Sequence, residues 1–266
     1  MTIKIEYKNG INRLLNAYAS VIEEEVEKGI EWRDKIEKGT LSDADHKNLL
    51  KDICAQLHVQ GRGARGVKTQ INKIEKRIGG WSIENIEKNL HNLGMSSKKI
   101  QKLKDIIEYL KTNSINKWII ELHNDNKSIP RMGPKSDDDF LKSHGFYEHI
   151  PVDRHTQRFL FRTGIIHWYL KRNNDDVLIL FRGDYEKKYK SFQKIIVVFC
   201  EEFCDNIYVH TPNGKLRLAE NPGILDIVIW RHCGEDENWG CRNICGNRPI
   251  CNKCVFKEAC LWYLLG

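Results

Sequence analysis

The chain has 266 residues, a formal net charge of +7 and a pI of about 8.8. Hydrophobic residues form 41% of the sequence, enough to build the core of one or two domains. No apolar run is long enough to cross a bilayer, and the charged first residues lack the apolar core of a signal peptide. We therefore expect an intracellular, cytoplasmic protein without a membrane partner, whose thiols stay reduced and whose positive charge favours a polyanion.

Helical periodicity dominates the first half of the chain. Apolar residues recur at three- and four-residue spacing over 11–36, and the pattern over 42–60 opens with Ser42 as a helix N-cap. Serine caps and glycine stops delimit several later helices. Those later helices are predicted over residues 69–80, 82–94, 96–113, 115–124 and 136–145.

The second half continues in the same way. Further helices are predicted from Asp153 to residue 164, over 185–204 and over 224–234. The dipeptide at 213–214, Asn-Gly, indicates a short β-hairpin between the last two of these helices. The sequence therefore predicts an all-α protein with short connecting loops.

Cysteines gather at the carboxyl end, in "CRNICGNRPICNKCVFKEAC" (241–260). Thiolates are soft ligands that suit an iron–sulfur cluster or zinc. Zinc sites usually combine two C-x2-C pairs, whereas this segment contains one, so we favour an iron–sulfur cluster with zinc as the alternative. The expected ligands, spaced C-x5-C-x2-C-x5-C, are Cys245, Cys251, Cys254 and Cys260.

The remaining cysteines allow other interpretations. Cys54, Cys200 and Cys204 lie inside apolar helical patterns and fit buried, structural thiols. Cys233 and Cys241 lie close enough in sequence to the cysteine segment that either could replace one of its ligands.

A Pro/Gly turn in the middle of the chain precedes a lysine. The segment "IPRMGPK" (129–135) ends on Lys135, and the exposed amides of such a turn can hold a phosphate oxygen. Asp153 follows at the start of the next predicted helix. Taken alone, Lys135 would be a solvated surface residue and Asp153 an ordinary N-cap. The acidic run 137–139 fits the start of a helix and is interpreted as structural.

Taken together, these segments resemble the helix–hairpin–helix and Gly/Pro-Asp motif of the endonuclease III superfamily of DNA glycosylases. In that family a motif of the type L-P-G-V-G-x-K is followed at a fixed offset by V-D-x-H-x-x-R, and here "IPRMGPK" and "VDRHTQR" stand at a matching offset. The cysteine segment resembles the [4Fe–4S] loop of many members. "DFLKSHGF" and "LDIVIW" are also similar to the archaeal-type 8-oxoguanine glycosylase branch. Arg131 replaces the first hairpin glycine, Pro134 removes an amide, and the first cysteine gap is one residue short.

The resemblance implies a fold of two helical domains that flank an active-site cleft. The first would be a helical barrel over 38–148 that carries the helix–hairpin–helix at 129–140. The second would combine 1–37 with 149–266 and contain the cluster loop at 241–260.

The resemblance also implies a base-excision-repair enzyme that acts on double-stranded DNA as a monomer. Lys135 would attack the sugar, release a damaged, preferably oxidised base, and form the Schiff base of an AP lyase, while Asp153 stabilises the developing positive charge. Two alternatives remain: a non-catalytic iron–sulfur module that recognises distorted duplex, and a glycosylase without lyase activity. The residues expected to contact DNA are Gln60, Arg62, Arg65, Lys98, Arg131 and Gly133.

Overall fold

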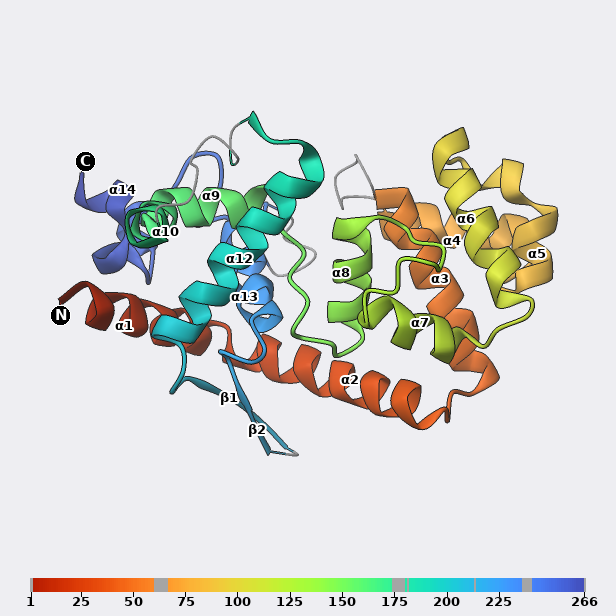
Figure 1. The fold of residues 1–266 in the computed structure, drawn as a ribbon, viewed down its shortest axis with the longest axis horizontal. Helices are drawn as coiled ribbons and strands as arrows, with labels where there is room; N and C mark the ends of the chain where they lie inside the picture. Colours follow the sequence, from red (N-terminus) through yellow and green to blue (C-terminus); the bar gives the residue numbers. More distant parts are fainter. Residues whose placement is uncertain are drawn as a thin grey trace. The chain divides into compact units, whose positions relative to one another are not determined.

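The structure, a computed structural model, describes residues 2–59, 67–173, 180, 182–212, 214–235 and 241–265. Helices make up nearly all of its regular structure (Figure 1), and the only sheet in the described ranges has two strands. The predicted all-α class is confirmed at this level. None of the helices in these ranges combines the length and the apolarity needed to span a membrane.

The chain forms two compact units. One consists of Ile30–Gly145 and the other of Met1–Gly29 with Phe146–Gly266. The boundary that the sequence predicted after residue 37 falls near the end of helix α2 (Ala19–Lys38), whereas the units divide inside that helix. A barrel form of the first unit stays a prediction.

The Ile30–Gly145 unit packs its helices around α3, which contacts α4, α6 and α8. Its largest buried side chains include Trp118 and Phe140, whose rings meet edge to face with centroids 5.7 Å apart. Each such side chain stabilises the unit by about 2–3 kcal/mol relative to its exposed state. The elements are α3 (Asp43–Val59), α4 (Val67–Ile78), α5 (Ile83–Lys88), η1 (Leu90–Leu93), α6 (Ser97–Leu110), α7 (Ile115–His123) and α8 (Pro134–Ser143).

The second unit is built on α9, which packs against α13, α10 and α14. Helix α1 lies beside the C-terminal segment (Figure 1), and a Cβ on Gly10 would come within 2.8 Å of the Phe256 ring, so only glycine fits there. The elements are α1 (Thr2–Ala17), the first half of α2, α9 (Arg154–Thr163), α10 (Ile165–Asn173), α12 (Tyr185–Phe203), β1 (Tyr208–Thr211), β2 (Gly214–Arg217), α13 (Gly223–Cys233), η3 (Cys251–Lys253), η4 (Lys257–Ala259) and α14 (Leu261–Leu264).

One prediction of local structure is wrong, one helix was missed, and one prediction is confirmed. The stretch 11–36 is not one helix, because α1 and α2 are separated at Tyr18, whose side chain is buried. Helix α10 was not predicted; it begins directly after Gly164, which ends α9 in a left-handed conformation. The predicted hairpin is present, and its strands pair Tyr208 with Arg217 in antiparallel register.

Candidate active site and cysteine loop

The hairpin that leads into α8 is held by its neighbours in the Ile30–Gly145 unit. Gly133 is the N-cap of α8 with a φ of 123°, a conformation that L side chains rarely adopt. Pro134 occupies the first helical position, where its missing N–H costs nothing. The Trp118 indole donates to the carbonyl of Pro130 at 3.0 Å, and the Lys102 ammonium donates to the carbonyl of Met132. The turn is therefore fixed from α6 and α7.

Lys135 lies in the first turn of α8, directly behind this hairpin, and is half-buried. Among the residues that the structure describes, none forms a hydrogen bond with its amine, but its charge acts on Asp139, one turn further along α8: although burial acts in the opposite direction, Lys142 and Lys135 lower the pKa of that carboxyl. The lysine that the sequence singled out is thus half-buried at a helix start, with the Asp139 carboxylate as an electrostatic neighbour.

Asp137 closes the hairpin from inside. Its carboxylate is fully buried and accepts the amides of Met132 and Gly133 at 3.0 and 3.3 Å. The Nε of Arg131 donates to the other oxygen at 3.0 Å. Burial raises the pKa of Asp137 to about 6, although the Arg131 guanidinium and the two amides act in the opposite direction. Amides that the sequence suggested for a phosphate oxygen therefore already hold a carboxylate of this chain.

The residues predicted to contact DNA have different surroundings. Arg131 pairs with both Asp137 and Asp125, so its charge is largely balanced within the hairpin. The Gly133 amide is bound by Asp137, as described above. Lys98 is exposed in the first turn of α6. Gln60, Arg62 and Arg65 lie outside the described residues.

Asp153 is the N-cap of α9 in the other unit, as the sequence predicted. Its Oδ1 accepts the amides of His155 and Thr156 at 2.7 and 2.9 Å. Among the described residues, no donor binds the second oxygen, Oδ2, and the side chain is half-buried. The segment before Asp153 is fixed by Tyr189 and Gln193 of α12, which both donate to the carbonyl of Ile150.

A second carboxylate approaches Asp153 from α13. The Thr156 hydroxyl lies 2.7 Å from Oδ1 of the buried Asp226 and 3.2 Å from Oδ1 of Asp153, so it connects the two carboxylates. Sequence reasoning did not assign a role to Thr156 or Asp226. The signal was present in "LDIVIW", where a lone carboxylate sits in an otherwise apolar helix.

Lys135 and Asp153 belong to different compact units. Each has the local setting that the sequence predicted, at the start of a helix. Their action on the same nucleotide stays a prediction.

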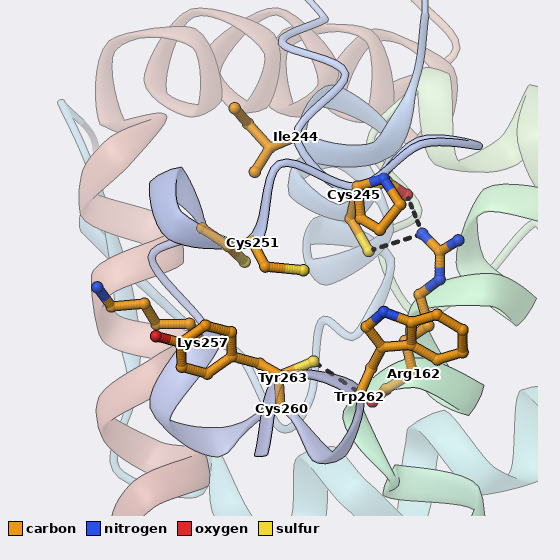
Figure 2. Close-up of a pocket in the computed structure, with 10 residues that line it drawn as sticks. Arg162, Ile244, Cys245, Cys251, Lys257, Cys260, Trp262 and Tyr263 are labelled. Carbon is orange, nitrogen blue, oxygen red and sulfur yellow. Dashed lines mark hydrogen bonds between the residues drawn. The ribbon is translucent and has the colours of Figure 1, made fainter. Parts of the chain in front are cut away.

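The four predicted cysteine ligands line one hollow in the second unit. Cys245, Cys251 and Cys260 surround it in Figure 2, and Cys254 also contributes to its wall. The 3₁₀ turn η3 presents Cys251 and, at its end, Cys254, while the end of η4 presents Cys260. Thus the segments on both sides of the C-x2-C pair fold back to bring four thiols to one place.

Arg162, from the last turn of α9, is the main cationic neighbour of the hollow. Its Nη1 donates to the carbonyl of Gly246 at 2.6 Å and lies 3.6 Å from the sulfur of Cys245. A hydrogen bond from the Cys233 thiol, followed by the Arg162 guanidinium, lowers the pKa of Cys245 to about 6. Burial raises the pKa of Cys254 to about 12, so this thiol loses its proton only beside a cation that takes up its charge.

Three of the other cysteines are buried, as predicted for structural thiols, while a ligand role for Cys233 or Cys241 stays a prediction. Cys54, Cys200 and Cys204 have no exposed surface. Cys233 is also fully buried. Its side chain forms a hydrogen bond with that of Cys245, and it lies next to the hollow without lining it. Cys241 packs against Gly234, where an added Cβ would lie 2.7 Å from its sulfur.

No three His, Cys, Asp or Glu side chains in the described part of the chain are placed to hold a metal ion. Comparison of the chain with known protein families, with characterised proteins and with solved structures found no match.

Proposed function

We propose that this chain is a DNA glycosylase with AP-lyase activity, which removes a damaged base from duplex DNA through a Schiff base on Lys135. The observation that carries the proposal is the setting of Lys135: a half-buried amine at a helix start, directly behind a fixed hairpin, with no hydrogen bond to a described residue. A nucleophilic lysine must be neutral when it attacks, and an amine without a hydrogen bond to the protein is free to reach the sugar.

Lys135 begins the reaction by forming a covalent bond to the sugar. The lone pair of the Lys135 nitrogen forms a bond to C1′ while the bond from C1′ to the base breaks, and the base leaves with the electron pair and takes up a proton. Opening of the sugar ring yields the Schiff base. Loss of a proton from C2′ then expels the 3′ phosphate, which cuts the strand.

Asp153 supports the first step. Its Oδ1 is fixed by two backbone amides, so its Oδ2 has a defined position from which to stabilise positive charge that develops on the sugar. Base removal also requires that the nucleotide leave the stack, at a cost of a few kcal/mol. Exposed cations such as Lys98 would contribute to binding through the phosphates.

The cysteine loop is proposed to hold a [4Fe–4S] cluster. Four thiols distributed around a hollow match a cluster in which each iron takes one cysteine. A single zinc ion instead needs all four sulfurs at about 2.3 Å from one point. Cys245, Cys251, Cys254 and Cys260 would be the ligands, and the bound cluster would supply a covalent brace for this end of the unit.

The test uses purified protein and a panel of duplexes, each with one lesion, beginning with oxidised purines and oxidised pyrimidines and including an abasic site. We expect strand cleavage on at least one duplex, a borohydride-stabilised adduct, and loss of both in Lys135→Ala. Lys127→Ala, an exposed lysine in the preceding loop, serves as the matched control and should keep full activity. Tight binding to distorted duplex without any cleavage would favour the non-catalytic module instead, and base release without strand cleavage would favour the monofunctional glycosylase.

A further inference from the structure

His232 connects to the cysteine loop in two ways. It lies in the last turn of α13, and its side chain is almost completely buried. Its backbone carbonyl accepts the amides of Ile244 and Cys245 at 2.8 and 3.2 Å. Its Nε2 lies 3.2 Å from the sulfur of Cys254. One residue outside the cysteine segment therefore contacts that segment through both its backbone and its side chain.

The other ring nitrogen of His232 also has a partner. Nδ1 lies 3.2 Å from the hydroxyl of Tyr18, at the junction of α1 and α2. The Tyr18 ring is buried, and the guanidinium of Arg242 lies over it at 4.6 Å from the centroid. Tyr18, His232 and Cys254 therefore form a continuous hydrogen-bonded series in the interior of one unit.

If Cys254 binds the cluster, its chemistry determines which atom of each group in this series carries the proton. A metal-bound thiolate can accept a hydrogen bond but cannot donate one. The His232 proton must then reside on Nε2, which leaves Nδ1 as an acceptor. The Tyr18 hydroxyl must donate to Nδ1, and burial favours this because it raises the pKa of Tyr18 to about 12 and keeps the hydroxyl protonated.

We propose that His232 is a positioning residue of the cluster: it donates an Nε2–H···S hydrogen bond to the Cys254 thiolate, with its tautomer set by Tyr18. The inference rests on the proposed [4Fe–4S] cofactor. Hydrogen bonds to cluster sulfurs draw negative charge away from the irons, which makes the cluster easier to reduce. Groups that orient a metal ligand in this way also strengthen metal retention. His232 should therefore raise the reduction potential of the cluster and slow its loss of iron.

The experiment uses full-length protein prepared anaerobically with its cluster. Iron and sulfide per chain, the reduction potential and the rate of iron transfer to a chelator are compared for wild type, His232→Phe, His232→Gln and Tyr18→Phe. We expect His232→Phe to lower the potential and to speed iron loss by about 10-fold or more. His232→Gln, whose amide can still donate, should recover part of both effects. Tyr18→Phe should shift both in the same direction by less.

The possible outcomes separate the inference from the cofactor proposal. His144→Phe changes a buried histidine of the other unit, bonded to the carbonyl of Phe140, and should leave the potential and the iron-loss rate unchanged. A wild type that takes up iron, with His232→Phe and Tyr18→Phe indistinguishable from it in both measurements, would overturn the inference alone. A wild type that binds no iron under these conditions would overturn the cofactor proposal and the inference together. If His232→Phe does not fold, His232→Gln and Tyr18→Phe still decide the matter.

Discussion

At the start of α8, the Asp137 carboxylate accepts two backbone amides and one guanidinium N–H, and it has no exposed surface. At the start of α9, the Asp153 carboxylate also accepts two backbone amides, but with one oxygen, and it is half-buried. Both carboxylates stabilise a helix start, yet only Asp153 retains an oxygen that no described residue binds. The comparison indicates that Asp137 completes the hairpin before α8, and the proposal assigns the remaining oxygen of Asp153 to the substrate.

The same contrast separates Lys135 from its neighbour Arg131. Arg131 is hydrogen-bonded to Asp125 and Asp137, whereas the amine of Lys135 forms no hydrogen bond with a described residue and interacts only electrostatically with Asp139. Within a few residues the hairpin thus contains one cation that carboxylates hold by hydrogen bonds and one that is not held in this way, to which the proposal assigns the chemistry. The predictions below test the structural and the chemical roles separately.

The largest effect is expected in the cysteine loop of the second unit, which Arg162 connects to α9. Cys254→Ser should lose nearly all bound iron and about 4 kcal/mol or more of the free energy of unfolding, because the cluster would bridge segments of that unit. Cys54→Ser is the control, since Cys54 is a fully buried thiol that lies in α3, outside the cysteine loop. It should keep its iron and lose about 1–3 kcal/mol. Iron content and urea unfolding provide the measurement, and a Cys254→Ser protein with full iron content would refute the ligand assignment.

The next effect separates the two roles of Asp153. Asn is as good an N-cap as Asp, so Asp153→Asn should change the free energy of unfolding by less than about 0.5 kcal/mol. Base excision should nevertheless fall about 100-fold, because a neutral amide cannot stabilise a cationic sugar. Asp153→Ala should lose the cap as well, at about 1 kcal/mol. Single-turnover kinetics and denaturant unfolding on the same preparations test both; wild-type rates in Asp153→Asn would show that its role is only structural.

The third effect concerns Asp137 and pH. Its pKa of about 6 in the folded chain exceeds the ordinary value of 3.8, so the folded state holds this proton more tightly than the unfolded state. The resulting stabilisation is complete below about pH 4 and is lost as the pH rises through 6, by about 3 kcal/mol in total. Asp137→Asn removes this titration.

The difference in unfolding free energy, wild type minus Asp137→Asn, should therefore fall between pH 4 and pH 7. A difference that stays nearly flat over this range, and instead rises with pH below about 4, would mean that the pairing with Arg131 outweighs burial. In that case the folded-state pKa of Asp137 would lie below its ordinary value.

The smallest effect is expected at Lys98. Because it is exposed, Lys98→Gln should weaken duplex binding a few-fold on all sequences alike and reduce the salt dependence of binding by about one counterion. Lys38→Gln, an exposed lysine that pairs with Asp34, should leave both quantities unchanged. Titrations at several salt concentrations provide the measurement. An unchanged salt dependence in Lys98→Gln would remove α6 from the proposed DNA contacts.

Features encoded by neighbouring residues were predictable from the sequence. The starts of α8 and α9 follow from local cap signals at Gly133, Pro134 and Asp153, and the closeness of the four thiols follows from their short spacing. These are properties of segments fewer than about twenty residues long, in which chain geometry leaves few alternatives.

Features that depend on tertiary contacts were not predictable. Asp226 meets Thr156 across 70 residues, and Tyr18 meets His232 across 214. The break at Tyr18 has the same origin, because its buried ring contacts α13 while the local pattern reads as continuous helix. Periodicity records which side of a helix is apolar, but it does not record which distant side chain that face will meet.

The central claim is that the nucleophile is Lys135, and the most direct measurement maps the covalent bond itself. Protein trapped with borohydride on a cleavable duplex is digested, and the peptide that carries the sugar remnant is identified by mass spectrometry. We expect the remnant on the nitrogen of Lys135 in nearly all of the trapped protein. A remnant on the amino terminus or on another lysine, with Lys135 unmodified, would contradict the assignment.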